Sequence, residues 1–349
     1  MQGRPPPALL CHPMLTTEQL VHYLTTTRNL TDLTVVARIE LGPTTRLTLQ
    51  HGSETWELAA SQPNDLTDLA TLQARLQLVK LAADKALTAP VLWADEQPAT
   101  LPNTLIYAQA APLGSPLTEA EYLADPLPAA TLLRNWHALG ANRPFAALKA
   151  PSVQHPQLQG IEPITPHSAL AWYLINYAEQ YPMAGVVAQN LAGLWLQLKA
   201  AYLRTPFDLN MLQVTHHALH WSQIIRLPNG RWHLAQLDTA LIDDPIADFI
   251  WLLAPLPPMQ QQQLLSAYGI PSFVHDEWLA HWRLRYIHRL LELAAQAAYL
   301  AFVALGAEPL AGFPAGVRPP AECQADYNQR VGQAAEMLGV TSPILQEWT

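Results

Sequence analysis

The hydrophobic period of this chain changes along its length, and this change restricts the folds open to it. Residues 31–61 contain short β-rich segments separated by turn-forming stretches rich in Gly, Pro, Thr and Ser. Residues 65–87 then carry apolar side chains at helical spacing. From Leu117 onward helical patterns dominate, with one β-type segment at 212–238. The pattern predicts an α+β chain, in which a small antiparallel sheet with one long helix precedes a mostly helical region. The expected first strands are residues 31–41, 46–50 and 55–61.

These patterns divide the chain into three expected regions. Residues 1–30 form an N-terminal extension with a short helix, and residues 31–112 form a lobe that contains the sheet. Residues 113–349 form a helical lobe. Its β-type segment contains Asn229 and Gly230 between two apolar stretches, a pair typical of a tight hairpin turn. We therefore expect a hairpin that joins residues 224–227 to residues 232–237.

Composition argues against several classes of partner. Only 13% of the 349 residues are charged, the net charge is −9, and the 19 basic residues form no run. Nucleic acid and acidic membrane are therefore not expected partners. Cys11 and Cys323 lie far apart in the sequence, which suits a reducing compartment, and the apolar run 293–307 is short for a bilayer. Because a run of three prolines interrupts residues 1–13, we expect no signal peptide and a cytoplasmic protein that does not bind membranes.

Three histidines lie within five positions, at His216, His217 and His220. Two histidines four residues apart on a helix can bind zinc when a general-base Glu follows the first of them. Here His217 follows the first histidine, and the flanking residues have β-type rather than helical patterns. A metalloenzyme that uses these three histidines is therefore the least favoured of the functions that we consider.

The histidine cluster resembles a known catalytic loop. In aminoglycoside phosphotransferases and choline kinases this loop reads His-Gly-Asp-Leu-His-Pro-Gly-Asn followed by hydrophobic residues, and this chain reads HHALHWSQII from His216. Both histidines of the family loop and the leucine between them match, at His216, Leu219 and His220. The family then has a hairpin, an Ile-Asp motif and a Gly-Asp-Pro-x-x-Asp-Leu motif. The matching positions in this chain are Asp238, Asp244, Pro245 and Asp248.

The resemblance extends, at varying strength, over residues 31–255. The stretch LLRNWHAL resembles a family helix with its histidine at His137, and residues 105–117 resemble the linker between the lobes. The resemblance implies a bilobal, protein-kinase-like fold with a small antiparallel-sheet lobe and a mostly helical lobe. In active members of the family, ATP and Mg²⁺ support phosphoryl transfer to a small molecule.

The resemblance also places the catalytic positions of the helical lobe. The family's general-base Asp corresponds to Ala218, its metal-binding Asn to Gln223, and its metal-binding Asp to Asp238. Loss of a general base typically lowers a rate by about 10²–10⁴. Because a hairpin brings its two ends back to the same side, we expect Ala218, Gln223 and Asp238 to lie together.

The sheet lobe lacks the phosphate-binding groups that the resemblance implies. The family's strand lysine corresponds to Ala59, and the helix Glu that braces it corresponds to Gln73. The phosphate loop corresponds to a turn with one glycine, Gly42. The only basic side chains in the expected strands belong to Arg38 and Arg46.

These replacements lead to three hypotheses. The first is a degenerate family member, a pseudokinase that binds an unknown small molecule or protein, with ATP and Mg²⁺ binding weak or absent. The second is an active phosphotransferase that uses Asp238 and Gln223 for Mg²⁺, with His217 as a substitute base. The third is the His-based metalloenzyme. Each retained residue also has a structural explanation, since Asp244 before Pro245 is a typical helix start and Asp238 can be a turn carboxylate.

Overall fold

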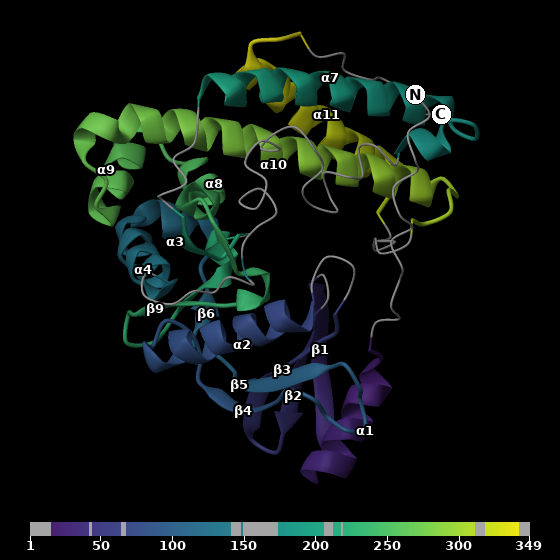
Figure 1. Ribbon diagram of the computed structural model, residues 1–349, viewed down its shortest axis with the longest axis vertical. Coiled ribbons are helices and arrows are strands. Elements are labelled where there is room, and N and C mark those ends of the chain that lie inside the picture. The colour runs from purple at the N-terminus through teal and green to yellow at the C-terminus, as the bar shows by residue number, and fades with distance from the viewer. Residues whose placement is uncertain are drawn as a thin grey trace. The chain divides into compact units, whose positions relative to one another are not determined.

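Two compact units make up the computed structural model (Figure 1). The first contains Met1–Lys149 and Leu212–Ser272, and the second contains Ala150–Met211 and Phe273–Thr349. The structure describes residues 15–41, 44–63, 68–140, 148, 174–205, 212–217, 219–310 and 318–341.

The first unit begins with a helix and an antiparallel sheet. Helix α1 (Thr17–Arg28) starts at Thr16, whose hydroxyl accepts the Gln19 amide in a capping box. The sheet has the strand order β1-β2-β3-β5-β4, and every neighbouring pair is antiparallel. The strands are β1 (Leu33–Leu41), β2 (Thr44–His51), β3 (Glu54–Ser61), β4 (Val91–Asp95) and β5 (Leu105–Ala110).

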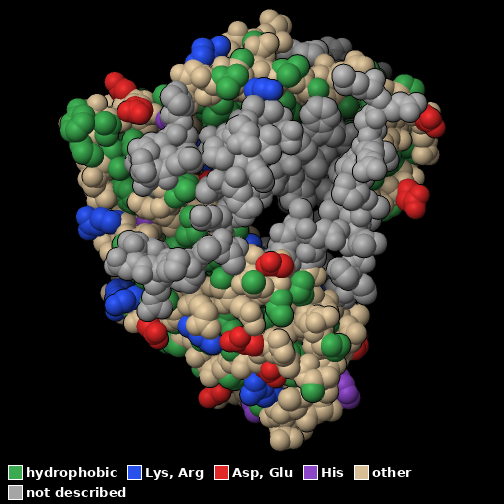
Figure 2. Space-filling view, in the orientation of Figure 1, with side chains coloured by type: hydrophobic (Ala, Val, Ile, Leu, Met, Phe, Trp, Pro, Cys, Tyr) green, Lys and Arg blue, Asp and Glu red, His purple; other side chains and the backbone are tan. Residues whose placement is uncertain are grey.

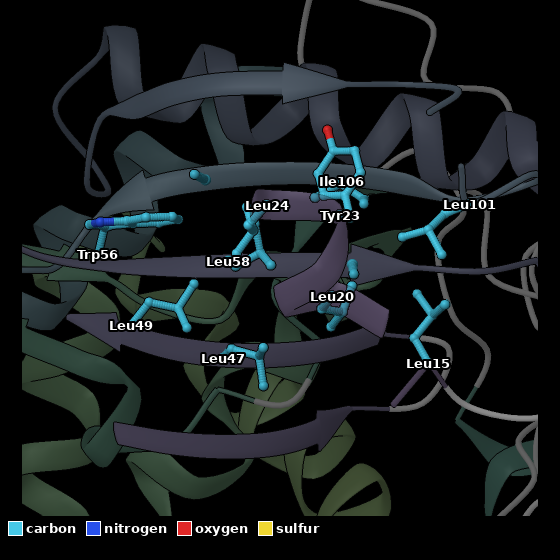
Figure 3. Close-up of a cluster of buried hydrophobic side chains, with 12 residues drawn as sticks. Leu15, Leu20, Tyr23, Leu24, Leu47, Leu49, Trp56, Leu58, Leu101 and Ile106 are labelled. Carbon is cyan, nitrogen blue, oxygen red and sulfur yellow. The ribbon is translucent and has the colours of Figure 1, made fainter. Parts of the chain in front are cut away.

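One face of this sheet packs against α1 and forms a buried core (Figure 3). Leu20 and Leu24 of α1 contact this face, to which β2 contributes Leu47 and Leu49. Because side chains alternate along a strand, the residues between these positions point to the other face. The other core members from the strands are Trp56, Leu58, Ala60, Ile106 and Ala108.

Helix α2 (Leu69–Asp84) follows the third strand, and Asp68 caps its first turn by accepting the Thr71 amide. This helix contacts β4 and β5. The sequence pattern predicted this helix over residues 65–87, and the observed helix lies inside that range.

The rest of the first unit carries short strands and helices. Strands β8 (Ile224–Arg226) and β9 (Trp232–Leu234) form the expected hairpin around Gly230, which has φ of +78°. The sequence pattern did not predict a further pair, in which β7 (Gln213–Thr215) runs antiparallel to β10 (Leu241–Asp243). The helices are α3 (Glu119–Ala124), α4 (Leu127–His137), α8 (Ile250–Leu253) and α9 (Pro258–Tyr268), with 3-10 turns at Ala138–Gly140, Trp221–Gln223, Leu237–Thr239 and Pro245–Phe249.

Gly114 holds the linker strand β6 (Ser115–Pro116) against the hairpin strand β8. A Cβ atom at this position would overlap the backbone carbonyl of Arg226. Gly114→Ala is therefore expected to force the linker and hairpin apart and to lower the free energy of unfolding by about 1–3 kcal/mol. Urea unfolding of the variant measures this loss, and Gly193→Ala on an open helix face, where a Cβ meets nothing within 4 Å, is the matched control.

The second unit is helical in its described part. Helix α10 (His275–Ala304) packs against α7 (Pro182–Arg204) and α11 (Pro320–Leu338). The helical pattern of the sequence extends over residues 167–181, of which 167–173 lie outside the described residues and Leu174–Tyr177 form a 3-10 turn. In the described ranges, no helix has the length and apolar character needed to cross a membrane.

On the face shown in Figure 2, charged side chains are scattered rather than gathered into a patch of one sign.

Candidate functional site

Strand register places Arg46, Ala59 and Tyr107 side by side on β2, β3 and β5. Arg46 pairs with Ala59, and Ala59 pairs with Tyr107. Their side chains lie on the sheet face opposite α1, because the alternate residues of the same strands form the α1 core. Ala59, the position matched to the family's lysine, is fully buried. The cation on this face therefore comes from the neighbouring strand, from Arg46.

The Arg46 guanidinium binds Asp238, which is 192 residues away in the sequence. Its Nε and Nη2 donate to Oδ2 of Asp238 at 2.9 and 2.8 Å, and its Nη1 lies 2.5 Å from Oε2 of Glu57. The Tyr107 hydroxyl donates to Oδ1 of Asp238 at 2.7 Å and accepts from Nη2 of Arg46 at 3.2 Å. Both carboxylate oxygens of Asp238 thus accept hydrogen bonds from the sheet.

Burial and pairing shift the pKa values of this cluster in a consistent pattern. Burial alone would raise the pKa of Asp238, but the Arg46 charge and the hydrogen bonds from Tyr107 and Arg46 hold it below its usual value. Burial would lower the pKa of Arg46, but the charges of Asp238 and its other partners raise it. Burial and the Asp238 charge raise the pKa of Tyr107 well above its usual value. At neutral pH the cluster therefore contains a carboxylate, a guanidinium and a neutral phenol.

Helix α2 contributes a second arginine beside Asp238. Nε of Arg75 donates to the Ala240 carbonyl at 3.2 Å, and burial lowers the pKa of Arg75. Gln73, the position matched to the bracing Glu, donates to Oε2 of Glu96 at 3.4 Å. Through Arg75, the helix therefore places a cation beside residues 238–240.

The two strand arginines have different partners. Arg38 donates to Oγ1 of Thr17 and to the Leu15 carbonyl, both at 2.9 Å, and so ties β1 to the start of α1. Of the two arginines that could have substituted for the missing lysine, Arg46 is the one on the Asp238 side of the sheet.

Asp248 anchors the loop that begins at His216, which resembles the catalytic loop of the family. Its carboxylate accepts the backbone N–H of His216 at 2.7 Å and that of His217 at 2.8 Å. Nε2 of His137 lies 3.0 Å from the same carboxylate, and Nδ1 of His137 lies 2.7 Å from the Tyr268 hydroxyl. Because Asp248 has 0% exposure, this carboxylate fixes the loop backbone from inside the fold.

His216 is a framework residue. Its side chain is buried, Nε2 lies 2.7 Å from the Ala235 carbonyl, and burial lowers the pKa of the imidazole. A carbonyl accepts a hydrogen bond, so Nε2 carries the proton of a neutral ring. The Thr239 hydroxyl donates to the His216 carbonyl at 2.8 Å, which ties the loop to the Asp238 turn.

His217 and Asp243 occupy the two positions at which the resembled motifs have glycine. His217 has φ of +68°, a left-handed conformation that favours glycine. Its Nε2 lies 3.2 Å from Oδ2 of Asp243, whose carboxylate is buried. The pairing of β7 with β10 brings the two residues together. The two replacements therefore contact each other.

His220 and Gln223 form a separate hydrogen-bonded turn. The amide oxygen of Gln223 accepts the His220 N–H at 2.8 Å, and its Nε2 donates to Gln236 at 3.2 Å. Nδ1 of His220 lies 2.9 Å from Oγ of Ser222, and burial lowers the pKa of the His220 imidazole.

Asp238 and Gln223, the two predicted Mg²⁺ ligands, lie at the two ends of the hairpin. The Ala235 N–H donates to the backbone carbonyl of Gln223 at 2.9 Å, so the hairpin brings its two ends back together. Magnesium needs oxygen ligands at about 2.0–2.1 Å in near-octahedral geometry. Here the side-chain oxygens of both residues already accept hydrogen bonds within the protein.

Two predicted site positions, Gly42 and Ala218, lie outside the described residues. Within the described residues, no group of three or more His, Cys, Asp and Glu side chains could hold a metal ion. The ring nitrogens of His216, His217 and His220 face three different partners. The metalloenzyme interpretation therefore has no support.

Sequence reasoning did not find the partners of Asp238. Strand alternation contained part of this information. Given which sheet face packs against α1, it places four residues on the opposite face, namely Arg46, Glu57, Ala59 and Tyr107. The pairing register was needed to bring them together.

Comparison with known proteins identifies the fold. A spectinomycin phosphotransferase solved with ADP and spectinomycin aligns with a TM-score of 0.57 and 12% identity, covering 93% of this chain and 99% of that one. A Plasmodium vivax ethanolamine kinase aligns at 0.56 and 10%, covering 91% and 90%, and a Streptococcus pneumoniae choline kinase at 0.53 and 13%, covering 93% and 99%. The sequence matches no protein-family model and no curated protein. The chain therefore has the α+β, kinase-like fold of aminoglycoside phosphotransferases and choline and ethanolamine kinases.

Proposed function

We propose that this chain is an aminoglycoside phosphotransferase-like pseudokinase, which binds a small molecule or a protein partner and transfers phosphate poorly or not at all. The observation that carries the proposal is the engagement of Asp238 by Arg46 and Tyr107. In phosphoryl transfer, such an aspartate must be available to a metal ion that neutralises the charge of the phosphates.

Electrostatics supports this proposal. A divalent ion bound to Asp238 would lie within about 5 Å of the Arg46 guanidinium, and at an effective dielectric constant of about 20 the repulsion between the two is about 7 kcal/mol. Moving Arg46 aside would in turn leave Glu57 without its buried partner. The site therefore disfavours the ion on which kinase chemistry depends.

The loop framework supports a binding role. Asp248, His137 and His216 keep the loop backbone in place through buried hydrogen bonds, although Ala218 stands where the family has its base. A framework retained without its reactive groups can still position a ligand. The nucleotide and the small-molecule substrate of the related kinases define the classes of ligand to test.

Phosphate transfer from radiolabelled ATP with Mg²⁺ to aminoglycosides, choline and simple sugars tests the proposal. We expect turnover at least about 10²–10⁴-fold below that of an active kinase of the same fold, assayed in parallel. Ala218→Asp is expected to leave this rate unchanged, because Asp238 stays bound to Arg46. Robust turnover by the wild type that disappears in His217→Ala would instead establish an active phosphotransferase with His217 as its base.

A further inference from the structure

The Arg46 guanidinium occupies a position with the chemical features of a cation site. Hard oxygen atoms surround it, from the carboxylates of Asp238 and Glu57 and from the hydroxyl of Tyr107. These are the donor types that Mg²⁺, Mn²⁺ and Ca²⁺ prefer. Arg46 and Asp238 are both nearly inaccessible to solvent, with 4% and 5% exposure.

The guanidinium also joins the elements that a bound ion would join. It links β2 to the turn Leu237–Thr239 through Asp238 and to β3 through Glu57. A cation that is part of the polypeptide provides this link at every metal concentration. A divalent ion would have to displace the guanidinium from an ion pair that burial protects from solvent screening.

We propose that Arg46 is a built-in substitute for the divalent cation, so that this site is organised without metal and any ligand that it takes is bound independently of metal. The same geometry implies a masked metal site, because Asp238, Glu57 and Tyr107 can hold a divalent ion once the Arg46 side chain is removed. The inference deepens the proposed function by naming what replaces the ion, and it rests on that function.

Manganese binding to the wild-type protein is the first test. Titration of the full chain with MnCl₂, followed by the electron paramagnetic resonance of free Mn²⁺, is expected to show no binding at Asp238 up to about 1 mM. Any ADP affinity is expected to be the same in MgCl₂ and in EDTA. Mn²⁺ binding that Asp238→Asn abolishes, or ADP affinity that rises tenfold with MgCl₂, would overturn the inference.

Metal rescue of Arg46→Ala is the second test. The variant loses the partner of two carboxylates, and we expect its Tm to fall by roughly 5–10 °C. MnCl₂ at about 10 mM is expected to restore several degrees by binding the folded state, while the wild-type Tm changes by less than about 1 °C. Arg38→Ala, which removes the same charge from β1, is expected to show no rescue, and Asp238→Ala in the Arg46→Ala background is expected to abolish it.

The outcomes separate this inference from the proposed function. Phosphate transfer that persists in EDTA would refute the pseudokinase and leave the Arg46 inference standing. Wild-type Mn²⁺ binding at Asp238 without turnover would refute the Arg46 inference and leave the pseudokinase proposal standing. A folded Arg46→Ala protein that gains no Mn²⁺ affinity also contradicts the inference, and if that variant does not fold, the wild-type titration alone decides.

Discussion

Asp248→Ala is expected to lower the free energy of unfolding by about 3–5 kcal/mol. The carboxylate has 0% exposure and accepts the N–H groups of His216 and His217, with His137 beside it. Alanine removes the acceptor and leaves two backbone amides and an imidazole nitrogen without it in the interior. Urea unfolding followed by tryptophan fluorescence measures the loss.

Two controls separate the anchor from a general effect of charge. Asp326→Ala on α11 removes a carboxylate that pairs with Arg330 and Arg318 in a partly exposed position, and is expected to cost less than about 1 kcal/mol. Asp248→Asn keeps one acceptor oxygen and is expected to fall between wild type and alanine. If Asp248→Ala lost no more than Asp326→Ala, the carboxylate would not be the anchor of the loop.

The pattern of hydrophobic residues predicted the longer strands of the sheet and helix α2. Alternation in the segments around Leu47 and Leu58 predicted strands, and the helical spacing around Leu72 and Leu76 predicted α2, because burial on one face determines both periods. The Asn229-Gly230 pair predicted the hairpin turn for a local conformational reason. The short strand β10 was missed because three residues are too few to establish a period.

Pairs that depend on tertiary register could not be predicted in the same way. Motif spacing located Asp238, and the strand pattern located Arg46, but nothing local states that a residue 192 positions away is its partner. A shift of one residue in the β2–β3 register would turn Arg46 to the other face. The His217–Asp243 pair likewise depends on the pairing of β7 with β10.

Asp238→Asn is expected to destabilise the protein by about 3–4 kcal/mol in the absence of any divalent ion. The amide NH₂ would face donors on Arg46 and Tyr107, and the guanidinium would lose most of its compensating charge. An aspartate kept free for a metal ion behaves in the opposite way, because without the ion its neutralisation relieves repulsion and stabilises the fold. The sign of the change therefore distinguishes a structural ion-pair partner from a vacant metal ligand.

The pH dependence of this loss identifies the charge of Asp238 as its source. Because the pKa of Asp238 is lowered in the folded protein, its contribution is fully present above the ordinary carboxyl pKa of about 4 and is lost as the pH falls through the lower folded-state value. The stability difference between wild type and Asp238→Asn is thus expected to be constant from about pH 5 to pH 8 and to shrink below about pH 4. Urea unfolding of both proteins at each pH measures it. A difference that persists undiminished in acid would mean that the amide disrupts packing, since protonation of Asp238 would then leave the loss unchanged.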